Sequence, residues 1–176
     1  VAVLILPLRS KGMNIEEARG HSVVIQPDEG PSYWQPLPAN GYSSIIAHQG
    51  NNGGSDISTG FQTIAVGGRV RPHSHQNQVE LQICFRGTGE VVVGGQCHPL
   101  SPGTTCLLGP DATHEIINNS NDDLVMLWVI SPSGLETFFQ QIGRVRNIKE
   151  APPEPFDRPR NISAIEKQSG FQNIGS

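Results

Sequence analysis

Two histidines and a carboxylate lie close together in the stretch GGRVRPHSHQNQVELQICFRG, residues 67–87. His73 and His75 are separated by one residue, so on an extended strand their side chains point to the same face. Glu80 follows a few residues later. Two imidazoles and a carboxylate on a cavity wall can converge on one divalent cation. The stretch therefore predicts most of a metal site, which a ligand from elsewhere in the chain must complete.

The elements expected to position these residues are short strands separated by Gly- and Pro-rich turns. The regular spacing of the candidate strands is typical of a sandwich or barrel. We therefore predict an all-β fold with a barrel over 43–131, an N-terminal extension and strap over 1–42, and a C-terminal helix and extended arm over 132–176. The proline-rich strap is expected to lie over the barrel without pairing, because proline cannot donate to a sheet. The candidate strands are 43–48, 61–66, 69–75, 79–85, 90–93, 96–100, 104–108, 113–118 and 124–130.

One amphipathic helix is predicted after the barrel. Ser133 can cap it, with Glu136 as the capping-box partner, and Gly143 can end it. Residues 151–160, APPEPFDRPR, predict an extended arm that wraps its own domain or reaches a neighbouring subunit, and 161–170 can form a second short helix. The first helix is expected to cover one end or side of the barrel with an apolar face made of Leu135, Phe138, Phe139 and Ile142.

Composition and charge exclude several classes of partner. The net charge is −4 and Lys and Arg are scattered, which argues against nucleic acid. The apolar start at residues 1–8 is too short to span a membrane as a helix. The three cysteines form no C-x-x-C pair, so reduced thiols and a cytoplasmic protein are expected. Exposed edge strands need covering, so we also expect a homodimer.

Side-chain alternation predicts further residues around the cation. Gln82 lies two residues beyond the carboxylate, so it either bonds substrate or is satisfied by a neighbouring strand. Arg71 has the parity of the two histidines, so it either meets an anionic substrate at the mouth or is solvated. Met126 and Trp128 share one face of the last candidate strand and can form an apolar wall for a small-molecule substrate.

Two sets of residues resemble the paired signatures of the cupin superfamily. In the second set Gly109 stands where the family has Pro, and Asp111 stands where it has Gly. These substitutions alter the turn, although aspartate still tolerates a left-handed conformation there, so we expect them to affect the shape of the loop and not the ligand. The first set is Gly67, His73, His75, Glu80 and Gly87, and the second is Gly103, Gly109, Asp111, His114 and Asn118.

The resemblance implies a double-stranded β-helix, or jelly-roll, barrel with one divalent transition metal. Its ligands would be His73, His75, Glu80 and His114. In an octahedral shell this set leaves two open positions for water, O₂ or a chelating substrate. We expect Fe²⁺, with Ni²⁺, Mn²⁺, Zn²⁺ or Cu²⁺ as alternatives, because imidazole and carboxylate ligands suit all of them.

The resemblance also suggests a reaction. Compact cupins similar to this chain include flavonol and diketone dioxygenases, so the leading hypothesis is a dioxygenase that oxidises an enolic or phenolic substrate chelated to the metal. Glu80 would then leave the metal transiently and act as a catalytic base. One alternative is an O₂-independent cupin isomerase, lyase or decarboxylase. Another is a non-catalytic module that binds a sugar or a small acid, because a fold alone does not fix a function.

Overall fold

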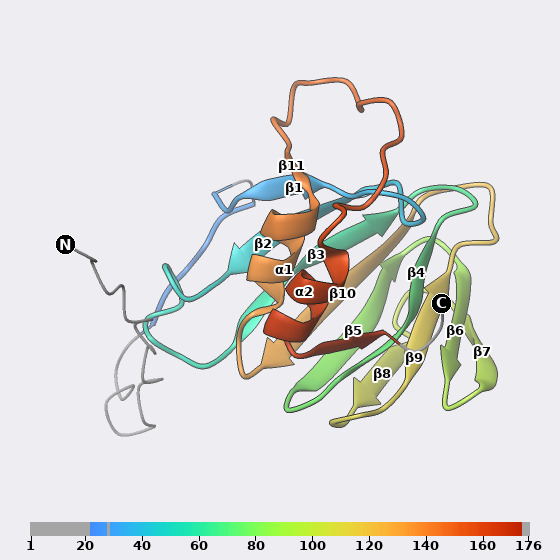
Figure 1. Cartoon of the computed structure of the whole chain (residues 1–176), viewed down its shortest axis with the longest axis horizontal. Helices are drawn as coiled ribbons and strands as arrows, with labels where there is room; N and C mark the ends of the chain where they lie inside the picture. Colours follow the sequence, from blue (N-terminus) through green and yellow to red (C-terminus); the bar gives the residue numbers. More distant parts are fainter. Residues whose placement is uncertain (1–21, 28, 174–176) are drawn as a thin grey trace.

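The chain folds into two antiparallel β-sheets that face each other, with two short helices beside them (Figure 1). The computed structural model describes residues 22–27 and 29–173, so the apolar start and the first part of the strap lie outside the described residues. Within the described part, neither helix has the length and apolar composition needed to cross a membrane.

All strand pairs are antiparallel, and the strand order confirms the predicted jelly-roll. The larger sheet has the order β11-β1-β2-β3-β10-β5-β8 and the smaller one β12-β4-β9-β6-β7. The larger sheet contains β1 (Ser32–Trp34), β2 (Tyr42–Ala47), β3 (Ser58–Ile64), β5 (Val79–Arg86), β8 (Thr105–Leu108), β10 (Leu124–Ser131) and β11 (Arg144–Val145). The smaller sheet contains β4 (Arg69–His75), β6 (Gly89–Val93), β7 (Gln96–Leu100), β9 (His114–Ile117) and β12 (Phe171–Asn173).

The core lies between the inner faces of the two sheets. Strand β5 shows the pattern most clearly, because Glu80, Gln82 and Cys84 are buried whereas Val79 and Phe85 are exposed. This is the period-2 alternation that the sequence predicted for a strand with one face inward. The apolar part of this core consists of Ile64, Cys84, Val91, Leu100, Ile116, Leu124 and Met126.

Special backbone conformations occur where the two signatures predicted turns. Gly67 and Gly87 both have positive φ angles, 72° and 87°. A Cβ atom at Gly87 would lie 2.6 Å from the backbone oxygen of Asp123, so a side chain has no room there. Asp111 adopts φ 61°, the left-handed conformation expected of it, and its N–H donates to the carbonyl of His75. The second turn is thereby joined to the end of the strand that carries two of the histidines.

Helix α1 (Leu135–Ile142) has the predicted apolar face, and all four of its residues are buried. The predicted capping box is wrong. The N-cap residue is Gly134, whose N–H donates to Glu136 Oε2 (2.9 Å), whereas the Ser133 hydroxyl donates to Asp56 Oδ1 (3.3 Å). A carboxylate distant in the sequence thus competes for the serine side chain. Gly143 ends the helix as expected, and its N–H donates to the Phe139 carbonyl.

The prediction that the proline-rich strap does not pair is wrong in part. Strand β1 is a genuine sheet strand that pairs with β2 and β11. It is only three residues long, and Pro31 and Pro36 lie outside it. The prolines therefore limit the length of the strand without preventing it, because neither has to donate a hydrogen bond within the ladder.

The C-terminal arm wraps its own domain. The carbonyl of Phe156 accepts a hydrogen bond from the N–H of Leu37, and the Arg144 guanidinium lies 4.0 Å from the Phe156 ring centroid. The second helix is present as α2 (Ile162–Gln168). The chain then forms β12, which was not predicted and which pairs with β4. Figure 1 shows α2 and β12 returning to the barrel beside α1 and β4.

Candidate metal centre

The fold brings the four predicted ligands together. His73 and His75 come from β4, Glu80 from β5 and His114 from β9. His73 and His114 are direct register partners on neighbouring strands, which explains how a histidine from a distant segment joins the other two. One potential ligand atom from each of the four residues lies within 4.8 Å of all the others, and all four side chains are buried. The arrangement can hold one metal ion.

Three of the polar atoms at the centre of this cluster have no hydrogen-bond partner. Glu80 Oε2 lies 3.2 Å from His75 Nε2 and 3.2 Å from His114 Nε2, but these contacts do not form hydrogen bonds. Buried polar atoms without a partner are costly and rare in folded proteins. Here they converge on one point, where a divalent cation would satisfy all three. The residues present therefore fit a metal ion.

Backbone carbonyls fix the orientation of two of the imidazole rings. His73 Nδ1 lies 2.8 Å from the carbonyl oxygen of Arg71, and His114 Nδ1 lies 3.0 Å from that of Ala112. A carbonyl oxygen can only accept, so each Nδ1 carries the proton and each Nε2 keeps its lone pair. Such outer hydrogen bonds select the tautomer that binds metal.

Electrostatics favour the same protonation states. Burial lowers the pKa of His73 well below its ordinary value, and the neighbouring His114 and His75 lower it further, while Glu80 opposes them. Burial alone would raise the pKa of Glu80, but in the metal-free protein His114 and His75 can carry a proton on the Nε2 atoms that face this carboxylate, and they then outweigh burial and hold its pKa below the ordinary value. His73 is therefore neutral and Glu80 ionised, as metal ligands must be. A carboxylate with a lowered pKa is a weak base, which favours the ligand role of Glu80 over a base role.

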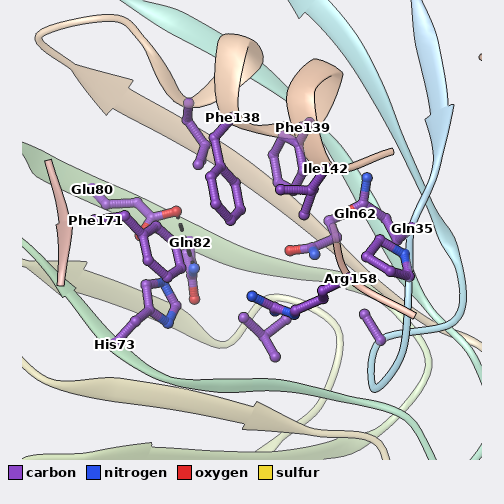
Figure 2. Close-up of a pocket in the computed structure, with 14 residues that line it drawn as sticks. Gln35, Gln62, His73, Glu80, Gln82, Phe138, Phe139, Ile142, Arg158 and Phe171 are labelled. Carbon is purple, nitrogen blue, oxygen red and sulfur yellow. Dashed lines mark hydrogen bonds between the residues drawn. The ribbon is translucent and has the colours of Figure 1, made fainter. Parts of the chain in front are cut away.

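A small cavity of about 30 Å³ adjoins the ligands (Figure 2). Its polar lining includes His73, Glu80, Gln35, Gln62, Gln82 and Arg158, and its apolar lining includes Val70, Leu135, Phe138, Phe139, Ile142 and Phe171. Helix α1 contributes Phe138 and Phe139 to this wall. The apolar face that was predicted to cover one end or side of the barrel therefore covers the candidate metal centre.

Phe171 from β12 covers the histidines. Its ring stacks on His73 with a centroid distance of 4.2 Å and an interplanar angle of 5°, and it forms a T-shaped pair with His75 at a centroid distance of 5.4 Å. The other face of Phe171 stacks on Phe138 of α1 at 4.5 Å. A continuous aromatic stack therefore runs from the helix to a predicted ligand and excludes water from that side of the site.

The remaining predicted site residues occupy different positions. Gln82 lines the cavity, where its Nε2 donates to Glu80 Oε1 (3.0 Å) and its Oε1 has no partner. Arg71 forms an ion pair with Glu166. Met126 packs in the core between the sheets, and Trp128 packs against α1. Neither Arg71 nor these two apolar residues is among the described residues that line the cavity, so their contact with substrate stays a prediction.

Seven lining residues escaped the sequence analysis, and four of them can contribute a polar group or an aromatic ring to the site: Gln35, Gln62, Arg158 and Phe171. Gln62 is the register partner of Met126, so the alternation along β3 held a usable signal. Gln35 comes from the strap, and Arg158 and Phe171 come from the C-terminal segment. These three have no local periodicity that would aim them at the cavity, because their positions depend on long-range packing.

Comparison with known proteins places this site in a family. Residues 60–130 match the model of the cupin domain. An L-ectoine synthase from Vibrio campbellii is 37% identical over 82 residues, which cover 44% of this chain and 63% of that protein. A second one, from Vibrio atlanticus, is 37% identical over 62 residues, or 34% of this chain and 48% of that protein. The chain thus spans less than two thirds of the length of these relatives.

Two solved structures share the fold. A sugar phosphate isomerase from Silicibacter pomeroyi superposes with a TM-score of 0.53 at 18% identity, covering 64% of this chain and 77% of the other. KdgF from a Halomonas species gives 0.54 at 21% identity, covering 66% and 99%. At these identities the likeness shows a common fold.

The prediction of an oxidoreductase, a dioxygenase, is wrong. The relatives found by sequence are named L-ectoine synthase, which is a lyase, and this supports the O₂-independent alternative. The error has a physical cause, because the same histidine and glutamate ligands leave open positions that serve either O₂ chemistry or Lewis-acid chemistry. The jelly-roll of two sheets and the buried cluster of predicted ligands agree with the matching model, so residues 60–130 of this chain form a cupin domain.

Proposed function

We propose that this protein is a metal-dependent lyase that acts on a small molecule without consuming O₂. The observation that carries the proposal is the convergence of three unpartnered buried atoms, from His75, Glu80 and His114, beside a cavity. The lyase class is supported by the relatives named L-ectoine synthase. A site of this kind supplies a fixed positive charge in a dry environment, which is what a heterolytic addition or elimination needs.

The metal ion would be held by His73, His75, Glu80 and His114. When bound, it would act as a Lewis acid that withdraws electron density from a substrate oxygen. The ligand set accepts Fe²⁺, Zn²⁺, Mn²⁺, Ni²⁺ or Cu²⁺, so the identity of the ion is left open in this proposal.

The protein side chains have separate tasks in this proposal. Gln82 donates to Glu80 and so holds the carboxylate in place, while its free Oε1 can accept a hydrogen bond from a substrate hydroxyl or amine. Phe138 and Phe171 exclude water from the centre, which strengthens electrostatic interactions inside it. The glutamine amide thus orients substrate while the aromatic side chains keep the site dry.

The metal requirement can be tested with matched histidine variants. His75→Ala removes a ligand, whereas His98→Ala removes an exposed histidine that also lies on a strand. We expect the wild type and His98→Ala to retain a divalent metal in elemental analysis, and His75→Ala to lose it with a native circular dichroism spectrum. If His75→Ala unfolds, the ion is structural; if the wild type retains no divalent metal under any loading, the proposal fails.

The reaction class needs a separate experiment. The metal-loaded protein would be incubated with a panel of small hydroxy and amino acids, with and without O₂, and the products analysed by mass spectrometry. We expect gain or loss of water, or cleavage of a C–O or C–N bond, at equal rates in both atmospheres. Consumption of O₂ in proportion to product would refute the proposal.

We also expect a homodimer. Strand β8 lies at an edge of the larger sheet and exposes Leu107, a large apolar side chain. An uncovered apolar edge favours association with a second copy. Light scattering coupled to size-exclusion chromatography tests this prediction, and a monomer at micromolar concentration would contradict it.

A further inference from the structure

Two arginines and one glutamate form a charge cluster beside the metal centre. Glu166 Oε1 accepts a hydrogen bond from Arg71 Nη2 (2.8 Å) and another from Arg158 Nη1 (3.2 Å). The three side chains come from β4, from the arm and from α2, and all are mostly buried, with 27%, 17% and 7% of their surface exposed in the order Arg71, Arg158 and Glu166. The cluster therefore joins the C-terminal segment to the strand that carries two predicted ligands.

This cluster has one positive charge more than its carboxylate neutralises. Among the ion pairs of the described residues, Glu166 is the only partner of either guanidinium, and both use the same oxygen. The Nε atoms of Arg71 and Arg158 are buried without a partner. Burial and, to a smaller extent, the nearby Arg71 lower the pKa of Arg158 to about 10, and Glu166 opposes both effects. Arg158 therefore remains charged at neutral pH, and a buried cation without enough counter-charge favours an added anion.

The surplus charge faces the cavity through Arg158. This residue lines the same cavity as His73, Glu80 and Gln82, whereas Arg71 is not among the described lining residues. Figure 2 shows the Arg158 side chain extending into the space beside Gln62 and Gln82. The cavity thus has predicted metal ligands on one side, a guanidinium on another and an aromatic wall from α1 between them.

We propose that Arg158 binds a carboxylate group of the substrate and makes the site specific for small organic acids. The inference rests on the proposed function, because it assumes that the metal ligands receive a second polar group of the same molecule. A guanidinium offers parallel N–H donors that match a carboxylate, and only one nitrogen of Arg158 is engaged by Glu166. A carboxylate fits better than a phosphate, because the surplus is a single positive charge. Glu166 acts as a positioning residue that holds Arg158 at the cavity.

The binding test uses acetate and acetamide, which have nearly the same shape but differ in charge. Both are titrated into Zn²⁺-loaded protein while the Nε–Hε signals of the arginines are followed by ¹⁵N NMR. We expect acetate to shift the Arg158 signal and to bind at least tenfold more tightly than acetamide. Arg158→Gln should weaken acetate binding at least tenfold, whereas Arg160→Gln, which changes an exposed arginine of the same arm, should have no effect. Should Arg158→Gln fail to fold, Arg158→Lys keeps the charge and is expected to give weaker acetate binding.

Three results would overturn the inference: equal affinity for the two probes, acetate binding that is unchanged in the Arg158 variants, or no acetate binding by the wild type. A fourth comes from Co²⁺-loaded protein, because a change in the visible cobalt spectrum at the acetate affinity would show that the anion binds the metal instead. The proposed lyase function and the proposed carboxylate subsite can be refuted by different results. Acetate binding through Arg158 without any turnover would refute the lyase, whereas turnover with an unchanged KM in Arg158→Gln would refute only the carboxylate subsite.

Discussion

Phe171 is predicted to control how fast metal leaves the centre. The residue is 7% exposed and stacks between His73 and Phe138. Truncation of a buried Phe to Ala costs about 3–5 kcal/mol. We expect about 3 kcal/mol for Phe171→Ala, at the low end of that range, because β12 is a short edge strand and can relax. The substitution mainly lowers the free energy needed to open α2 and β12, which can separate from the barrel as a local unit.

This energy converts into a rate if metal leaves through the opened segment. Because 1.4 kcal/mol corresponds to a factor of ten, 3 kcal/mol predicts metal release roughly a hundredfold faster in Phe171→Ala. Zn²⁺-loaded protein would be mixed with an excess of a fluorescent chelator in a stopped-flow instrument. The control is Phe85→Ala, which truncates a phenylalanine that is 59% exposed on β5. It should release metal at the wild-type rate.

Hydrogen exchange of the backbone N–H groups of β12 supplies an independent readout. We expect exchange to accelerate in Phe171→Ala by the same factor as metal release, because both report the same opening. If exchange accelerates while the release rate stays within about twofold of wild type, far below the hundredfold set by the energy conversion, metal does not leave by this route and the reasoning is wrong.

Three further predictions concern stability. Asn118→Ala should cost about 3 kcal/mol in urea unfolding, because the two N–H groups of the buried amide are shared among three backbone carbonyls. The matched control is Asn119→Ala, which changes an exposed neighbour and should alter stability by less than about 0.5 kcal/mol. Glu166→Gln should cost about 2 kcal/mol in thermal unfolding, because it leaves Arg71 and Arg158 without their carboxylate. This is below the usual range for a broken buried ion pair, since both arginines retain some solvent exposure. A gain in stability would contradict the surplus of positive charge in this cluster. The metal-free protein should lose stability as the pH falls below 6.5, the ordinary pKa of histidine, because His73 protonates in the unfolded chain but not in the fold. The loss should continue below 4.5, because the pKa of Glu80 is also lower in the folded state; urea titrations across this range that show constant stability would refute the assignment.

The ligand-bearing strands were predictable because alternation is a local property. His73 and His75 had to share a face on any extended strand, and Glu80 and Gln82 had to share one on the next. His114 followed from the resemblance of the second signature, and the antiparallel pairing of β4 with β9 explains in physical terms why that position meets the others. The predicted residues that the structure brings together are those indicated by strand alternation or by a motif.

Errors arose where a distant residue outcompeted a local pattern. Ser133 lies at the sequence position of a helix cap, but its hydroxyl donates a hydrogen bond to Asp56 and Gly134 becomes the N-cap. Residues 32–34 lie in a proline-rich context, yet the edge of β2 recruits them into a strand. The reaction class was missed for a comparable reason, since the ligand set is shared by several chemistries and the substrate side of the cavity comes from other segments.

The C-terminal segment explains why the barrel alone forms an incomplete site. Without β12, strand β4 would be the edge of the smaller sheet, and its unpaired backbone groups and two histidines would face water. Pairing with β12 makes β4 an inner strand, and the same step places Phe171 on His73 and brings Glu166 within reach of Arg71. A barrel cut at residue 131 would therefore keep the four predicted ligands but lose their cover, the guanidinium of Arg158 and the wall from α1. We infer that the working unit extends through β12, because the segment with the weakest local signal completes both the dry side and the charged side of the cavity.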